Sequence, residues 1–248
     1  MIKHFGIFSV TSGALAILIC LQGCMTSSTS LPANEAFALS ASALSGSDTY
    51  GFAGEVSLFK PGGSIGSKAA YEGEVTLHGN MKMQWINSGL SAASAHSSAS
   101  RAYRPLQLLE SVNDKSNVIS YAEKPMQAKP VQIRIQLNEK AASDRVAEGL
   151  REEIKLLRSD KELLRGDSVK AEQILAAADE RLEKALTTLK ANTVCLWTAD
   201  PKSWFPERMR EETSLTYVWE GKTYKEKRIS ETNFLRKVRN GTMLKVNK

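Results

Sequence analysis

The stretch FAGEVSL at residues 52–58 returns at residues 71–77 as YEGEVTL, so both copies share the pattern aromatic-x-Gly-Glu-Val-x-Leu. Each copy alternates with a period of two, which places the aromatic residue, glycine, valine and leucine on one face of a strand and the glutamate on the other. A turn signal, KPGG at residues 60–63, separates the copies, and residues 81–85 alternate again. The repeat therefore predicts a three-stranded antiparallel meander with one apolar face.

A glycine stands in the middle of that apolar face twice, at Gly54 and Gly73. A glycine inside a strand marks a bend or a place where another group approaches the backbone closely. Two interpretations follow: a curved sheet covered by a helix, or a concave face with space for an apolar ligand. The candidate ligand face consists of Phe52, Gly54, Val56, Tyr71, Gly73, Val75, Met83 and Trp85.

The rest of the chain alternates between strand and helix patterns. Strands are predicted at residues 117–122, 131–137, 215–219 and 223–229, the last two joined by a turn at Glu220-Gly221. Short helices are predicted at 35–44 and 105–112, and long amphipathic helices at 139–164 and from 168 to Asn192. An Asn240-Gly241 pair predicts a further hairpin. The expected fold class is α+β: a curved antiparallel sheet, half-barrel-like, with the two long helices packed on one face.

The N-terminal segment has the features of an export signal. Lys3 precedes an apolar run at residues 5–21, which Ser and Gly dilute too much for a permanent membrane span. The run ends in Leu21-Gln22-Gly23-Cys24, which resembles the lipobox of bacterial lipoprotein signal peptides. The resemblance implies cleavage before Cys24 and a diacylglyceryl group on its sulfur, whereas Cys20 follows the bulky Ile19. An uncleaved N-terminal anchor is the alternative.

This assignment divides the chain into a signal peptide (1–23), a lipidated tether (24–33) and one α+β domain (34–248). A lipid anchor joined to a curved sheet with a helical cover resembles, in topology, the LolA/LppX/LprG-like envelope lipoproteins. That resemblance implies an extracytoplasmic protein that binds an apolar or amphiphilic ligand such as a lipid. In a cell with two membranes, the outer membrane is the expected location, because Met25 after the cysteine replaces the aspartate associated with inner-membrane retention.

The sequence carries no clear motif for catalysis or for metal binding. There is no HExxH, Walker loop or strand-linked GxGxxG, and His78 and His96 are the histidines that follow the signal. Residues 62–66 (GGSIG) match GxSxG, but they follow the turn signal between two predicted strands and do not lead from a strand into a helix as a nucleophile elbow does. Cys195 lies in an apolar strand pattern, which predicts a packed, inert thiol. Glu55 and Glu74 are expected to be solvated carboxylates facing lysines, not a paired-acid site. The sequence predicts a non-enzymatic protein without metal or cofactor.

The chain carries a formal charge of +6, and the excess gathers at its end. Residues 222–248 contain nine Lys or Arg against two Glu. Such a skew favours anionic surfaces such as lipid headgroups or wall polymers, and export argues against nucleic acid. The alternative function is therefore an envelope scaffold that binds another protein or an anionic polymer through the helical pair or these basic strands. The anionic-surface candidates are Lys225, Lys227, Arg228, Arg236, Lys237 and Arg239.

Overall fold

The computed structural model describes residues 31–60, 62–76, 80–86, 104, 106–112, 116–159 and 168–236. Its strands are β1 (Tyr50–Phe59), β2 (Ile65–Thr76), β3 (Asn80–Ile86), β4 (Val118–Tyr121), β5 (Val131–Gln136), β6 (Lys190–Ala199), β7 (Pro206–Trp219) and β8 (Lys222–Arg236). The helices within the described residues are α1 (Ala33–Ser45), α4 (Gln107–Ser111), α5 (Glu139–Ser159) and α6 (Ser168–Leu186).

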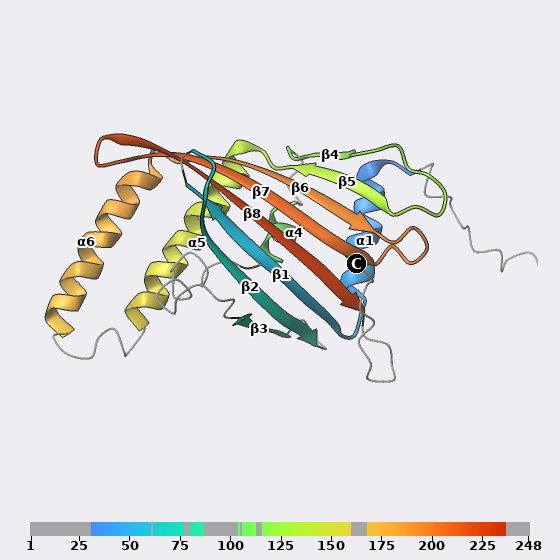
Figure 1. Ribbon diagram of the computed structural model, residues 1–248, viewed down its shortest axis with the longest axis horizontal. Coiled ribbons are helices and arrows are strands. Elements are labelled where there is room, and N and C mark those ends of the chain that lie inside the picture. Colours follow the sequence, from blue (N-terminus) through green and yellow to red (C-terminus); the bar gives the residue numbers. More distant parts are fainter. Residues whose placement is uncertain are drawn as a thin grey trace, which may run out of the picture.

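The strands form one open, curved antiparallel sheet in the order β3-β2-β1-β8-β7-β6-β5-β4 (Figure 1). The predicted α+β class and the predicted meander β1-β2-β3 are both confirmed. The long C-terminal hairpin β7-β8 lies in the centre, because β8 pairs with β7 on one side and, over Lys227–Arg236, with β1 on the other. This pairing joins the N-terminal meander to the C-terminal half of the chain.

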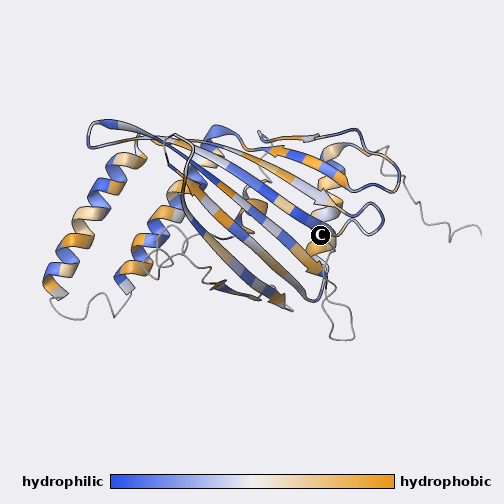
Figure 2. Cartoon of the chain, in the orientation of Figure 1, coloured by the Kyte–Doolittle hydropathy of each residue, from blue (hydrophilic) through white to orange (hydrophobic). Residues whose placement is uncertain are grey.

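Alternation gives the sheet one apolar face, which forms the core. Val131, Ile133 and Ile135 of β5 are buried there with Trp197 of β6 and Phe234 of β8. Figure 2 shows the matching alternation of hydrophobic and hydrophilic residues along the strands. Since each strand turns alternate side chains to opposite faces, the other face is polar.

Helix α1 lies across the apolar face. The ring of Phe37 contacts that of Trp197 edge-on, with centroids 5.4 Å apart, and the Trp197 indole N–H donates to Ser40 Oγ at 2.8 Å. All three side chains are buried, so this short helix is a structural part of the core.

The two long helices, α5 and α6, cover the apolar face of the sheet to different extents. Helix α5 buries Ala142, Val146 and Ala147 against the sheet. Helix α6 lies beside α5, joined to it by the Arg151–Glu183 ion pair at 2.7 Å, and extends to one end of the molecule (left in Figure 1).

The second long helix was predicted to reach Asn192, and this is wrong: α6 ends at Leu186 and β6 begins at Lys190. Leu189 continues the helical spacing, but the alternation of Ala191, Thr193, Cys195 and Trp197 suits a strand that buries one face. The predicted packed thiol is confirmed, since Cys195 is fully buried and burial raises its pKa well above 9.0. The predicted Asn240-Gly241 hairpin and the predicted end of the first long helix lie outside the described residues.

Candidate functional site

The predicted apolar ligand face lies in the core. Phe52, Val56, Tyr71 and Val75 are buried, and Met83 and Trp85 pack partly buried against them. Their rings contact one another, since Phe52 lies 6.3 Å and Trp85 5.5 Å from Tyr71, measured between centroids.

Aromatic rings fill the space beside both glycines. Register pairs Phe52 with Gly73 and Tyr71 with Gly54. A Cβ on Gly54 would lie 2.6 Å from Tyr71 Oη and closer still to the Glu231 carbonyl oxygen, while one on Gly73 would meet the Phe52 ring. The glycines therefore allow a close approach of the neighbouring ring.

A cavity of about 500 Å³ lies where the end of α1 and the α4 region face β1 to β3, and Tyr50, Val75, Met81 and Leu106 are part of its lining. The space under α5 is smaller and charged. A cavity of about 110 Å³ lies between α5 and the central strands and is lined in part by Arg145, Glu153 and Arg228. Sites for small-molecule ligands usually measure about 300–1,000 Å³. Among the described residues, this cavity therefore offers little room for an acyl chain.

A buried ion pair lies next to this cavity. Arg145 donates to Glu211 Oε1 at 2.6 Å, and both side chains are almost completely buried. Burial raises the pKa of Glu211, but Arg145, Arg228 and a hydrogen bond from Thr213 outweigh it, so the pKa lies below its usual value. In this buried position, the charges of Arg145 and Glu211 therefore compensate each other.

The opposite face of the sheet carries a much larger groove, of about 1130 Å³. Its floor is a row of residues that lie directly opposite one another on five consecutive strands. This floor, from β1 to β5, consists of Ala53, Asn233, Arg208, Thr198 and Gln132. The loop between β4 and β5 forms the wall at the end of the sheet and contributes Glu123, Lys124, Pro125, Met126, Lys129 and Pro130.

The same row continues toward the other edge of the sheet. Glu72 of β2 lies opposite Ala53, and Gln84 of β3 lies opposite Glu72. A second hollow of about 340 Å³ covers this part and shares Ala53 and Leu235 with the first. Seven strands at about 4.8 Å spacing give the row a length of roughly 29 Å. We call the two hollows together the cross-strand groove.

The cross-strand groove is lined by side chains that can exchange hydrogen bonds and by charged groups. Gln132, Thr198 and Asn233 offer amide and hydroxyl groups, which both donate and accept hydrogen bonds. Arg208 on the floor is held by the carboxylate of Glu231, which Arg210 also contacts. Burial and the nearby Asp200 charge raise the pKa of Glu207 at the groove edge. The described residues contain no cluster of three metal-ligating side chains.

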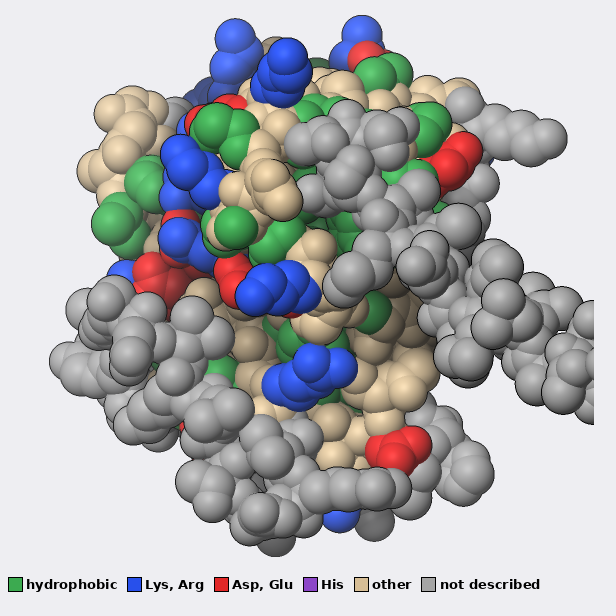
Figure 3. Space-filling model, turned by 90° about the vertical axis from the view of Figure 1, so that its right-hand side faces the viewer, with side chains coloured by type: hydrophobic (Ala, Val, Ile, Leu, Met, Phe, Trp, Pro, Cys, Tyr) green, Lys and Arg blue, Asp and Glu red, His purple; other side chains and the backbone are tan. Residues whose placement is uncertain are grey.

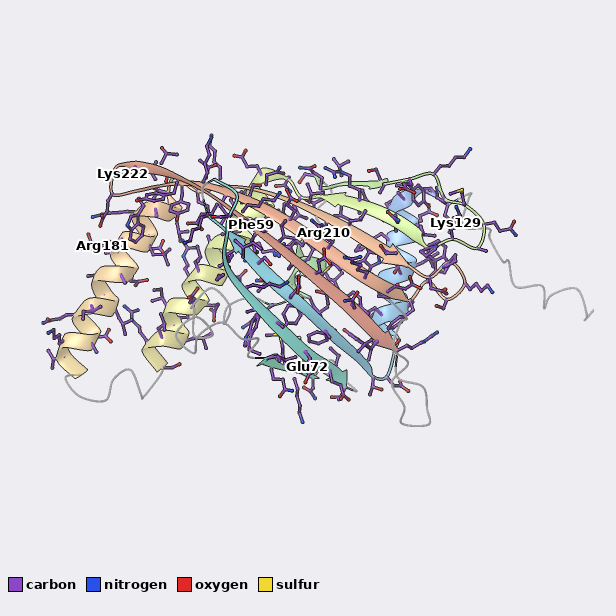
Figure 4. The ribbon with its side chains drawn as sticks, in the orientation of Figure 1. Phe59, Glu72, Lys129, Arg181, Arg210 and Lys222 are labelled. Carbon is purple, nitrogen blue, oxygen red and sulfur yellow. The ribbon has the colours of Figure 1, made fainter. Side chains whose placement is uncertain are left out.

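The wide part of the groove opens at the end of the sheet where the N-terminal segment enters the domain. Tyr121, the last residue of β4, donates its hydroxyl to the Leu31 carbonyl at 2.7 Å. The β4–β5 loop starts directly after Tyr121, so this loop and the start of α1 lie at the same end (right in Figure 1). Figure 4 marks the two ends of the molecule, with Lys129 on this loop and with Arg181 and Lys222 far from it.

The predicted basic residues do not form one patch. Lys227 pairs with Glu212 at 2.6 Å on the polar face, whereas Arg228 reaches the buried Glu211 at 3.5 Å on the other. Arg236 lies over the Phe205 ring, 5.3 Å from its centroid, and Lys225 is exposed. Lys237, Arg239 and the predicted lipidation site Cys24 lie outside the described residues.

Glu55 and Glu74, the two carboxylates that the sequence analysis considered, lie on the polar face of the sheet near lysines. Glu55 contacts Lys68 at 2.7 Å, and both side chains are nearly half exposed. Glu74 of β2 lies opposite Lys82 of β3. This agrees with the prediction of glutamates that face lysines.

Sequence reasoning missed the groove, although alternation correctly placed residues such as Gln132 and Glu72 on a polar face. Comparison with protein-family models and with curated proteins found no match to this chain. Within the part of the chain that the structure describes, no helix has the length and apolar character needed to cross a membrane.

Proposed function

We propose that the protein is a membrane-tethered, extracytoplasmic lipoprotein that binds the polar head group of a membrane amphiphile in the cross-strand groove. One observation carries this proposal: a groove of about 1130 Å³ with an amide-lined floor lies at the end of the sheet where the N-terminal segment enters. The lipid anchor itself rests on the lipobox at Leu21-Gln22-Gly23-Cys24.

The floor favours a polar head group over an acyl chain. Covering Gln132, Thr198 and Asn233 with hydrocarbon would leave their amide and hydroxyl groups without partners, at a cost of about 1–3 kcal/mol each. Hydroxyl, phosphate or amide groups of a ligand would satisfy them. The apolar side chains of Pro125, Met126 and Pro130 lie in the wall at the tether end, where the ligand's tail would leave toward the bilayer.

Binding without catalysis fits the groups present. The polar side chains of the floor are amides and a hydroxyl, and its one cation, Arg208, is engaged by Glu231. We therefore assign the groove a carrier or receptor role that needs no cofactor.

Native mass spectrometry of the full chain, extracted from membranes in mild detergent, tests the proposal. The wild-type protein should carry an amphiphile as an adduct. The double variant Thr198→Val/Asn233→Ala should retain about tenfold less, since two lost hydrogen bonds are worth roughly 1–3 kcal/mol.

Ser214→Ala is the matched control. This exposed residue of β7 lies on the same polar face but far from the groove, so the adduct should remain. A wild-type protein without any adduct, or equal retention by the double variant and this control, would contradict the proposal.

A second candidate function is docking of another envelope protein on the helical pair. The observation that favours it is the exposure of Val169 (68%), Ile174 (60%) and Leu156 (46%) on α6 and α5. Ile174→Lys should then abolish the crosslinking of one specific protein to the native membrane-bound chain. An unchanged crosslinking pattern would exclude this candidate.

A further inference from the structure

The β4–β5 loop, residues 122–130, presents an apolar side chain between two cations. Met126 is 48% exposed, and Lys124 and Lys129 are both exposed. The loop is a defined structure, since the Lys129 N–H donates to the Met126 carbonyl at 3.2 Å and Ala128 adopts a φ of 62°. The hydrogen bond closes a turn over residues 126–129, with its third residue in the left-handed region.

The loop lies beside the chain segment that leads to the proposed anchor. The hydrogen bond from Tyr121 fixes Leu31 next to the start of the loop. From Leu31 back to Cys24 the chain is seven residues long, which spans at most about 25 Å when fully extended. An anchor on Cys24 would therefore keep this end of the domain close to the bilayer.

Several further cations belong to the same end. Val131 pairs with Ala199, which brings the β4–β5 loop next to the β6–β7 loop and its exposed Lys202. The acidic residues on these loops and beside them include Glu123, Asp200, Glu207 and Glu35, whose charge adds to burial in raising the pKa of Tyr121 at the start of the β4–β5 loop. Strand β8 also ends here, at the exposed Arg236.

Figure 3 looks onto this end of the molecule and shows Lys and Arg side chains interspersed with hydrophobic ones and with Asp and Glu. Each basic residue near an anionic bilayer contributes about 1 kcal/mol of attraction. A turn tip with a single exposed methionine is small compared with a stable protein interface, which buries about 800 Å² on each partner. The chemistry therefore matches a bilayer surface better than a protein.

We infer that the β4–β5 loop docks on the anionic phospholipid surface of the membrane, with Met126 among the upper acyl chains and Lys124 and Lys129 at the headgroups. This inference rests on the proposed lipid anchor and gives the wide end of the cross-strand groove an orientation, open toward the bilayer. A head group would then enter the groove without leaving the membrane surface.

Cysteine accessibility in native membranes tests the inference. Full-length Met126→Cys and Lys222→Cys variants are labelled with a charged maleimide, before and after detergent solubilisation. The native Cys195 is fully buried, and Lys222 is an exposed control far from the loop, as Figure 4 shows. In membranes M126C should react about tenfold more slowly than in detergent, as expected for two lysines that hold the loop at an anionic surface, while K222C should react equally in both.

Equal reaction of membrane-bound M126C in both states would overturn the docking and leave the anchor intact. Protection of M126C that persists in detergent would overturn it too, because it would indicate a protein partner. A chain recovered in the soluble fraction would overturn the lipid anchor and, with it, this inference.

Discussion

Gly54 and Gly73 show how a short repeated sequence pattern lets two neighbouring strands pack closely. When two copies of aromatic-x-Gly pair as antiparallel strands, each ring lies over the glycine of the other copy, as Phe52 does over Gly73 and Tyr71 over Gly54. Tyr71 completes the arrangement with a 2.6 Å hydrogen bond to Thr232 of β8. The three strands are thereby joined through one small cluster.

Alanine at either glycine should therefore destabilise the fold. The added Cβ would meet fixed backbone, the Glu231 carbonyl at Gly54 and the Lys82 carbonyl at Gly73, besides the rings. Because overpacking of this kind costs typically 1–3 kcal/mol, we expect Gly54→Ala and Gly73→Ala to lose about that much or more in urea unfolding.

The matched control is Gly149→Ala in α5, where an added Cβ meets nothing within 4 Å. Helix propensity predicts a gain of about 0.5–1 kcal/mol there. If all three variants unfold at the same urea concentration, the close approach of the rings does not determine how the substitutions at Gly54 and Gly73 affect stability.

The buried Arg145–Glu211 pair predicts a pH dependence of stability. The folded-state pKa of Glu211 is lowered, so its contribution is present above the unfolded-state value near 4.5 and is lost as the pH falls below it. At pH 7, Glu211→Gln should cost about 3–5 kcal/mol, because it removes the carboxylate that faces the buried Arg145 charge.

Urea unfolding between pH 3 and 7 measures both effects. Wild-type stability should fall below pH 4.5, and Glu211→Gln should remove part of that slope. Glu55→Gln, in an exposed ion pair, should change stability by less than about 1 kcal/mol. A slope identical in wild type and Glu211→Gln would show that Glu211 does not contribute to it.

At the scale of elements, α1 depends on one buried hydrogen bond. Ser40→Ala would leave the Trp197 indole N–H buried without an acceptor, which costs about 1–3 kcal/mol. Ser42→Ala, on the exposed side of the same helix, should change the stability by only a small fraction of the effect of Ser40→Ala. Thermal unfolding followed by tryptophan fluorescence compares the two, and equal midpoints would rule out a structural role for this hydrogen bond.

Elements formed by local patterns could be predicted from the sequence, and those formed by distant pairing could not. The meander and the β7–β8 hairpin follow from alternation and from turn residues such as Glu220-Gly221, both of which have positive φ. The β1–β8 pairing joins Ala53 to Asn233, and no local signal marks it.

The cross-strand groove could not be predicted from the sequence for the same reason, because it also depends on distant pairing. Asn233, Thr198 and Gln132 become neighbours only through the register of β5 to β8. The ligand face suggested by Gly54 and Gly73 was an interpretation of missing side chains, and only the structure shows that rings from the neighbouring strand occupy that space.

At the scale of the whole molecule, the two ends differ. The start of α1, the β4–β5 loop and the wide part of the groove share one end, while α6 extends to the other (Figure 1). In this arrangement a membrane anchor would place the groove near the bilayer and the helical pair away from it.

The anchor predicts a difference between two cysteines of the same segment. In cells given an alkyne-tagged fatty acid, Cys24→Ala should abolish incorporation into the protein, because the acylated sulfur and the new N-terminus are both lost. Cys20→Ala should leave incorporation unchanged, since on the predicted cleavage before Cys24 it would belong to the removed signal. Equal incorporation in both variants would refute the assignment of Cys24.

Photocrosslinking in intact membranes tests the central claim most directly. A photoreactive amino acid replaces Gln132 or Asn233 on the groove floor or, as a control, Gln173 on α6, and the products are analysed by mass spectrometry. The account predicts one amphiphile mass attached at both groove positions and absent from position 173. No amphiphile at positions 132 and 233, or the same products at all three positions, would contradict it.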